Sequence, residues 1–460
     1  MTNRMQFIGK ILLFFLLLLL CACSSLMTTT SQYNGTDVLL EQQDYLTAIQ
    51  RIEKAKGKQY RKKDRVLYYL DLGMLYHYAG DYRKSNEMLT QAENNMEELY
   101  TKSISKAAMS MLLNDNVLEY SGEDYEDIYT NVFKALNYLA LSQSDEAFVE
   151  IRRINMKLDL LEDKYGRLAS EMNKSSYNKI KLKTGENRFL NDALGRYLSM
   201  LLYRKEGKLD DARIDREKIM EAFDLQKNIY DFPIPNLPDS LDSEGGKVKV
   251  NILSFTGRSP VKKSYDMFLT TGEDMVLISG NKPDFFVAPV IMPVEEGYHF
   301  RFSVPYIQAV PSRISAVKVV VDDGIPFELE TIEDINRVAT EAFKVKEPLI
   351  YMKSLTRTIV KGIVSERQKR KMRDKNTGWG GILLSLATDI AVDLTENADL
   401  RLSRFFPSRA SMGEISLDPG NHFFKMNYYD SNGQILYVEN LGIYEVKAGQ
   451  LNLLESHYLR

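Results

Sequence analysis

Two residues of the chain carry a thiol, Cys21 and Cys23, and both follow directly on an apolar run. The run covers residues 11–20 and is preceded by the cations Arg4 and Lys10. A basic start, a short apolar stretch and a small residue before a cleavage point are typical of a secretory signal. The chemistry predicted for this end of the chain is therefore proteolytic cleavage next to a cysteine. A plain signal peptide and an uncleaved anchor are the alternatives.

The tetrapeptide Leu20-Cys21-Ala22-Cys23 resembles a bacterial lipobox, although Cys21 stands where that pattern prefers a small or β-branched residue. The resemblance implies that residues 1–22 are a lipoprotein signal peptide and that Cys23 becomes an acylated N-terminus. A triacylated cysteine carries enough hydrocarbon for stable membrane residence. Ser24 stands where an aspartate favours retention in the inner membrane. By analogy we expect a lipid-anchored envelope protein in the outer membrane, facing the periplasm rather than the cell surface.

The remaining residues show no constellation for catalysis or metal binding. None of the four histidines has a second histidine or a cysteine at metal-ligand spacing. They are His77, His299, His422 and His457. No G-x-S-x-G, Walker A, G-x-G-x-x-G or H-E-x-x-H motif is present. The sequence therefore predicts no enzyme, no metal and no cofactor.

Two polar features have simple structural interpretations. The stretch Ser254–Pro260 is small and polar enough to bind an anion, but it is more simply the loop that leaves a strand. The acidic pairs Glu123-Asp124 and Asp210-Asp211 lie at predicted helix starts, where they suit the helix dipole.

Bulk composition excludes some classes of partner. The chain has 460 residues, and its 60 basic and 63 acidic residues give a formal charge of −3, so no nucleic-acid partner is expected. No cysteine follows Cys23, which rules out a disulfide within the folded part. No later apolar run reaches the eighteen or so residues of a membrane-spanning helix. The predicted membrane contact is therefore the N-terminal lipid.

We expect a tether over residues 23–36, rich in Ser and Thr, and a helical domain over residues 37–230. The clearest unit is Tyr69-x2-Leu72-Gly73-x2-Tyr76, with a turn at Gly80-Asp81 and Ser85 following. This unit resembles a tetratricopeptide repeat (TPR), in which small residues let two antiparallel helices approach closely.

Weaker copies of the unit lie on both sides of it, and Tyr138 falls in the third. A stacked array of this kind leaves a concave surface for a partner. The candidate partner-binding residues are Tyr69, Tyr76 and Tyr138, each of which could equally be a core residue of its own repeat. An irregular helical bundle without a groove is the alternative.

Residues 231–246 are predicted to be a Pro/Gly linker, because Pro233, Pro235 and Pro238 cannot continue a helix. Residues 247–460 form the predicted α+β domain, which begins with strands of alternating polarity. A helical insertion is expected at about 331–397, with helices over 333–343 and 350–371. The end, about 411–460, reads as a small antiparallel β-sandwich of its own.

One further surface is a candidate for contact with anionic lipid or polymer. Arg367, Lys369 and Arg370 belong to a basic run at the end of a predicted helix, and Trp379 opens the next one. Clustered cations bind anionic headgroups, and Trp is enriched at membrane interfaces. The alternatives are a solvated helix end and a helix packed on the sheet.

The whole layout resembles an uncharacterised family of bacterial outer-membrane lipoproteins with divergent TPRs. The residues that carry the resemblance are Gly122-x2-Tyr125-Glu126, Lys134–Ala140, Glu396-x-Ala398-Asp399-x-Arg401 and Leu417-x-Pro419-Gly420. The expected function is a non-catalytic scaffold that binds a protein partner, for which the cell-wall or envelope assembly is the candidate. A regulator or activator of a peptidoglycan-synthesis enzyme and a carbohydrate- or peptidoglycan-binding module are the alternatives.

Overall fold

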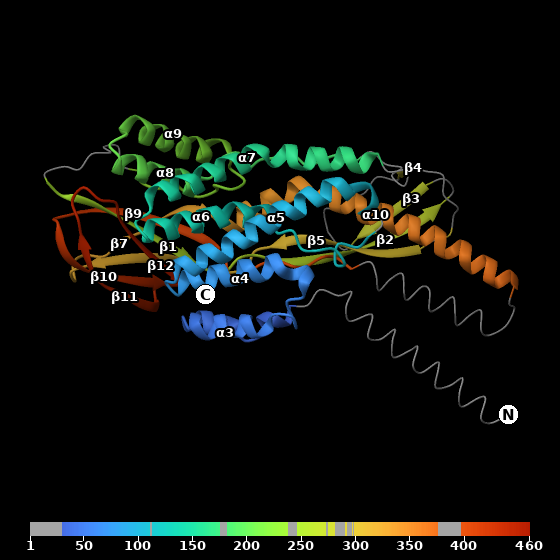
Figure 1. Ribbon diagram of the computed structural model, residues 1–460, viewed down its shortest axis with the longest axis horizontal. Coiled ribbons are helices and arrows are strands. Elements are labelled where there is room, and N and C mark those ends of the chain that lie inside the picture. Colours follow the sequence, from blue (N-terminus) through green and yellow to red (C-terminus); the bar gives the residue numbers. More distant parts are fainter. Residues whose placement is uncertain are drawn as a thin grey trace, which may run out of the picture.

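The computed structural model describes residues 30–110, 113–174, 182–237, 246–272, 275–280, 290–291, 297, 299–375 and 397–460. Within these ranges a first half of helices is followed by three mainly antiparallel sheets and one long helix (Figure 1). The predicted mixed α+β class is confirmed at this level.

The helices of the first half pair in chain order: α4 packs on α5, α6 on α7, and α8 on α9. These helices and short 3-10 turns are η1 Ser31–Tyr33, α2 Thr36–Glu41, α3 Tyr45–Ala55, η2 Lys62–Asp64, α4 Arg65–Tyr78, α5 Tyr82–Ser110, α6 Asp124–Ala140, α7 Ser144–Asn173, α8 Ala193–Lys205 and α9 Leu209–Leu225. Local sequence sets several starts, since Asp44 accepts from the Thr47 amide and Asp192 from the Gly195 amide. Asp210 and Asp211 lie in the first turn of α9, as predicted.

Helices α4 and α5 approach each other at Gly73. A Cβ atom added there would lie 2.5 Å from Leu89 Cδ2, and Ser85 Oγ donates to the Gly73 carbonyl at 2.8 Å. The small residues of the predicted repeat unit therefore act as expected, by permitting close contact of two helices.

We expect Gly73→Ala to destabilise the protein by about 1–3 kcal/mol, because the new methyl group overpacks the contact with Leu89. Gly166→Ala on α7 is the matched control, since a Cβ there meets nothing within 4 Å. The control should stabilise by up to about 1 kcal/mol through helix propensity. Urea unfolding followed by circular dichroism measures both, and equal shifts in the two variants would contradict the packing argument.

Three four-stranded sheets follow, with strand orders β12-β1-β9-β8, β11-β10-β6-β7 and β4-β3-β2-β5. The strands are β1 Val248–Thr256, β2 Val261–Gly272, β3 Met275–Gly280, β4 Val290–Ile291, β5 His299–Gln308, β6 Ala316–Val321, β7 Phe327–Glu328, β8 Glu330–Asp334, β9 Arg409–Leu417, β10 Gly420–Tyr429, β11 Ile435–Val446 and β12 Asn452–Tyr458. All described pairings between these strands are antiparallel except β1 with β12, which is parallel.

The prediction that residues 411–460 form a module of their own is wrong. β9 and β12 flank β1, whereas β10 pairs with β6 and β11. One cluster of buried side chains, including Val250, Val319 and Phe424, draws on the first two sheets together. Alternating polarity reveals strands but not their partners, and here the partners lie more than a hundred residues upstream.

The two helices predicted over 333–343 and 350–371 are one helix, α10 Ile335–Lys375, which continues through Pro348. Proline removes one hydrogen bond and usually breaks a helix. The neighbouring carbonyl of Val345 accepts from the Gly185 amide at 2.8 Å, so another segment packs along the helix at this point. α10 then crosses one face of the β2–β5 sheet (Figure 1), where Leu355 and Ile359 pack on its strands.

The largest cluster of buried side chains continues from the helices into the sheets. It contains Leu70 of α4 and Phe133 of α6 together with Phe255 of β1, Phe406 and Leu459. The strap 231–237 joins it through Phe232 and Leu237. The two predicted domains, 37–230 and 247–460, therefore share one core.

Candidate functional site

The three tyrosines predicted to bind a partner are half-buried and packed against the largest core. Tyr69 and Tyr76 lie on α4, and Tyr138 lies on α6. The Tyr76 hydroxyl donates to Glu53 Oε1 at 2.9 Å, and partial burial together with this carboxylate raises the pKa of Tyr76 to about 12. Tyr76 is thus engaged between α3 and α4, and partner binding by the three tyrosines stays a prediction.

The other predicted site residues cannot be placed in the same way. Arg367, Lys369 and Arg370 belong to α10, but their side chains lie outside the described part of the structure. Cys23 and Trp379 lie outside the described residues altogether.

Where the structure describes them, the polar residues singled out in the sequence form hydrogen bonds that connect elements of the fold. His77 is buried, with Nδ1 2.7 Å from Asn137 Oδ1 and Nε2 2.6 Å from Glu455 Oε1, so it links α4 to α6 and β12. Burial opposes protonation, but the Glu455 carboxylate raises the pKa of His77. Residues 254–256 are the end of β1, and residues 257–260 are the loop that leaves this strand, as predicted in the simpler interpretation; Ser259 donates to the Ser403 carbonyl at 2.8 Å.

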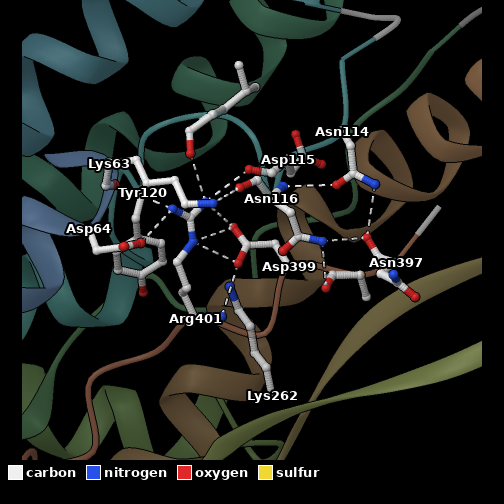
Figure 2. Close-up of polar contacts among 12 residues, drawn as sticks. Lys63, Asp64, Asn114, Asp115, Asn116, Tyr120, Lys262, Asn397, Asp399 and Arg401 are labelled. Atoms are coloured by element: carbon white, nitrogen blue, oxygen red, sulfur yellow. Dashed lines mark hydrogen bonds and ion pairs between the residues drawn. The ribbon is translucent and has the colours of Figure 1, made fainter. Parts of the chain in front are cut away.

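The most elaborate polar site lies where this loop, the helices and residues 397–408 meet. We call residues 397–408 the junction segment. Arg401 is its centre, with 4% of the residue exposed, and Figure 2 shows acceptors on several sides of its guanidinium. The acceptors are Asp399 Oδ1 and Oδ2 at 2.8–3.2 Å, Asp64 Oδ1 at 3.1 Å, and the carbonyls of Asp115 at 2.9 Å, Leu118 at 3.0 Å and Lys63 at 3.4 Å.

The charges around Arg401 hold one another ionised. Burial opposes the charge of Arg401, but Asp399 and Asp64 raise its pKa. Burial would likewise raise the pKa of Asp399, but the guanidinium of Arg401 and the ammonium of Lys262 lower it. Asn114 and Asn116 donate to the Asn397 carbonyl at 3.2 and 2.7 Å, which fixes the start of the junction segment (Figure 2).

Ser403 lies two residues after Arg401 and donates hydrogen bonds to two buried carboxyl groups. Its amide donates to Glu126 Oε1 at 2.7 Å, and its hydroxyl donates to Asp71 Oδ1 at 2.6 Å. The other oxygen of Glu126 accepts from Tyr120 at 2.6 Å and from the Glu123 amide at 2.7 Å. Ser403 thus ties the junction segment to α4 and α6 at once.

Both carboxyl groups are buried and titrate far above their usual range. Burial raises the pKa of Asp71 to about 7, against the three hydroxyl groups that donate to it. Burial also raises the pKa of Glu126 to about 7, with a smaller contribution from Glu123. Carboxyl groups with strongly shifted pKa values are common at catalytic sites. Here, however, each oxygen of Asp71 and Glu126 accepts a hydrogen bond from a donor of the chain itself.

A second buried charge cluster borders the junction on the side of α10. Glu123 accepts from Lys262 of β2 and from Lys346 of α10, the latter at 2.6 Å. Asp124 accepts from Lys164 at 2.7 Å. The acidic pair predicted to suit the dipole of a helix start does begin α6, but it also binds three cations from other elements. The sequence could not show those partners.

One open pocket lies elsewhere, between the strap 231–237 and the ends of β6, β8 and β9. Its volume is about 220 Å³, and its lining includes Phe232, Leu329 and the charged residues Glu328, Glu330 and Arg409. Sites for drug-sized ligands are about 300–1,000 Å³. The pocket suits a side chain or a small polar group better than a cofactor.

Comparisons with protein-family models, with curated proteins and with solved structures find no match. Among the described residues no group of three or more His, Cys, Asp and Glu side chains is placed to hold a metal ion. None of the described helices is long and apolar enough to span a membrane.

The junction was largely missed by the sequence analysis. Asp399, Arg401 and Glu126 belong to the motifs that carried the family resemblance, but nothing in the sequence placed them together. The available signal was the spacing Asp399-x-Arg401, a charge pair that alternates with the apolar residues Ala398, Leu400 and Leu402.

Proposed function

We propose that the chain is a non-catalytic lipoprotein of the cell envelope, anchored through Cys23, and that it holds a protein partner on its helical half. The consecutive helix pairs α4/α5, α6/α7 and α8/α9 support a TPR-like array. We place the protein in the outer membrane, on the periplasmic side. The shared core and the buried junction support one rigid body rather than two hinged domains.

The observation that carries the proposal is an exposed apolar stripe on α7. Val149, Met156 and Leu160 are 45%, 53% and 48% exposed. Spacings of seven and four residues put them on one face, over about 16 Å of helix. The opposite face is buried through Ile151, Ile154, Leu158 and Leu161. Apolar surface that is contiguous and exposed marks interaction sites more often than single residues do.

We expect the double variant Met156→Glu and Leu160→Glu to reduce capture of the partner at least tenfold, since charges in the centre of an apolar interface are costly. Stability should change little, because both side chains are exposed. The measurement is crosslinking and affinity capture of the full-length protein from its own envelope. Ile325→Glu is the matched control, because Ile325 is 92% exposed in the turn between β6 and β7.

Cys23→Ala tests the anchor in the same experiment, and it should release the protein from membranes without abolishing capture. Unchanged capture by the double variant would remove the α7 stripe from the proposal. Recovery of a cell-wall synthase would select the alternative, a regulator of peptidoglycan synthesis. Recovery of peptidoglycan without any protein would contradict the scaffold.

A further inference from the structure

The loop between α3 and α4 is the most basic stretch of the described chain surface near its N-terminal end. Of the twelve residues Lys54–Arg65, seven are Lys or Arg and only Asp64 is acidic. The Asp64 carboxylate is occupied by Arg401 at 3.1 Å. We call residues 54–65 the basic loop. Its net charge is therefore not balanced within the loop.

Four of these cations are exposed and have no carboxylate partner in the described structure: Lys54, Lys56, Lys58 and Lys62. Two others are engaged, because Lys63 donates to the Asn116 carbonyl at 2.5 Å and Arg65 pairs with Glu98 at 3.1 Å. Lys56 Nζ also lies 4.9 Å from the centroid of the Tyr68 ring, but the exposed ammonium groups of all four lysines are available to an anionic partner outside the chain.

The basic loop lies beside the first described residues of the chain. Tyr33 and Tyr60 donate to the same oxygen of Asp71, at 2.8 and 2.5 Å. Tyr33 also donates to the Leu402 carbonyl at 3.1 Å, so this end of the chain is fixed and not merely nearby. Thr30 is three residues from Tyr33, a span of at most about 10 Å.

Cys23 is only seven residues before Thr30, which is at most about 25 Å of extended chain. An acylated Cys23 would lie at the membrane surface, so Tyr33, which shares Asp71 with Tyr60 of the basic loop, would lie at most about 35 Å of extended chain from the headgroups. We infer that Lys54, Lys56, Lys58 and Lys62 form a surface that binds the anionic phospholipid headgroups of the membrane that holds the anchor. This inference rests on the proposed lipid anchor.

The acidic groups around the loop do not cancel it. Glu53 is exposed and accepts from the neutral Tyr76 hydroxyl, so it can offset one cation of the loop, whereas Asp37, on α2, pairs with Arg258 at 2.7 Å. Arg51 adds a cation on the same side, since its guanidinium lies against Gly35, close to Tyr33. Each lysine near an anionic surface contributes about fivefold in affinity, and a single weak anchor gains most from such a second contact.

The test uses residues 24–460, which are the predicted mature polypeptide without the acylated Cys23; every described contact lies within them, because the described residues begin at Thr30. It is floated with vesicles of phosphatidylcholine alone or mixed with phosphatidylglycerol. We expect binding only to the mixed vesicles, weaker at high salt. Replacing the four lysines of the basic loop by Gln should lower binding at least tenfold.

The matched control replaces four lysines of α8–α9 and its flanks by Gln: Lys205, Lys208, Lys218 and Lys227. These lie at the opposite side of the molecule from α3 (Figure 1), and the net charge falls equally in both variants. Equal loss in both variants, or equal binding to both kinds of vesicle, would overturn the inference. Binding to isolated peptidoglycan in place of the mixed vesicles would overturn it too.

A second measurement, fluorescence quenching, tests whether the basic loop lies at the membrane surface in the anchored protein. The chain has no cysteine beyond Cys23, so Lys58→Cys offers one free thiol once Cys23 is acylated. A fluorophore at this position should be quenched by quenchers attached to headgroups, whereas a fluorophore at Lys227→Cys should not. Mass spectrometry reports acylation separately and the capture experiment reports the partner, so failure of the proposed function and failure of this inference remain distinguishable.

Discussion

Arg401→Ala is expected to destabilise the protein by about 3–5 kcal/mol, which is a large share of the stability of a folded domain. The substitution removes the guanidinium that pairs with Asp399 at 2.8 Å, and it leaves Lys262 as the remaining cation beside that mostly buried carboxylate. It also removes the donors for the carbonyls of Asp115 and Leu118. Urea unfolding at neutral pH measures the loss, and circular dichroism establishes whether the variant folds at all.

Two further variants identify the cause of that loss. Arg401→Lys should recover little, because an ammonium group cannot reach acceptors spread around a planar guanidinium. Adding Asp399→Asn to Arg401→Met should restore part of the stability, since a neutral amide needs no counter-charge. Arg213→Ala is the control for an exposed pair, because the side chains of Arg213 and Glu217 are 55% and 57% exposed, and it should cost at most about 1 kcal/mol. A similar small effect for Arg401→Ala would contradict the structural role of the guanidinium.

Stability is expected to fall as the pH rises from about 5 to about 7, which is the reverse of ordinary acid denaturation. The three carboxyl groups of Asp71, Glu126 and Glu439 have their pKa raised to about 7, in each case chiefly by burial. In the unfolded chain they titrate near pH 4. The folded state therefore holds more protons between these values, and its stability is greatest below pH 4–5 and is lost as pH rises through 7.

Other groups oppose this trend and set the acid limit. Burial lowers the pKa of His457 to about 4, so its contribution grows between about pH 4 and 6.5. Burial would raise the pKa of Glu93, but Lys157 and Lys134 lower it to about 2. The contribution of Glu93 is present above its unfolded pKa and is lost as the pH falls through 2. His457 offsets only one of the raised carboxyl groups, which also include Asp192, with its pKa raised to about 6 by burial, and Glu333, so the decline with rising pH remains.

Melting temperatures between pH 4 and 8 test this balance. We expect a maximum near pH 5 and a loss on the order of 5 kcal/mol by pH 7.5, taking about 1.4 kcal/mol per unit of pKa shift for Asp71 and Glu126. Asp71→Asn should flatten the decline, since Tyr33 can still donate to the Leu402 carbonyl. Asp163→Asn, whose side chain is 70% exposed, should leave the slope unchanged. A profile that rises steadily to pH 7.5 would contradict the raised pKa values.

Features decided by neighbouring residues could be predicted from the sequence. The α4–α5 contact followed from Gly73 and Ser85, and the start of α9 from Asp210-Asp211. The β1–β2 loop was recognised from its small polar residues. These signals are local, because helix periodicity, turn chemistry and close approach each depend on residues a few positions apart.

Features decided by distant partners could not be predicted. The parallel neighbours β1 and β12 are separated by about two hundred residues, so their alternating patterns showed strands but no pairing. The gap predicted between helices 333–343 and 350–371 is absent, because α10 continues through Pro348. Ser403 carries no motif at all, yet it joins Asp71 and Glu126. The partner-binding role of Tyr69, Tyr76 and Tyr138 stays a prediction.

The junction segment and the parallel β1–β12 pair also determine when folding can finish. Tyr33 donates to the Leu402 carbonyl, His77 of α4 meets Glu455 of β12, and Leu459 belongs to the largest core. Contacts this distant in sequence slow folding, because closing the long intervening loop costs conformational entropy before the contacts themselves can form. A chain made from its N-terminus onward therefore holds helices with an open apolar face until its last residues arrive. Loss of the final strand would leave that face uncovered for good, so quality control of this protein can be expected to act on its C-terminal end.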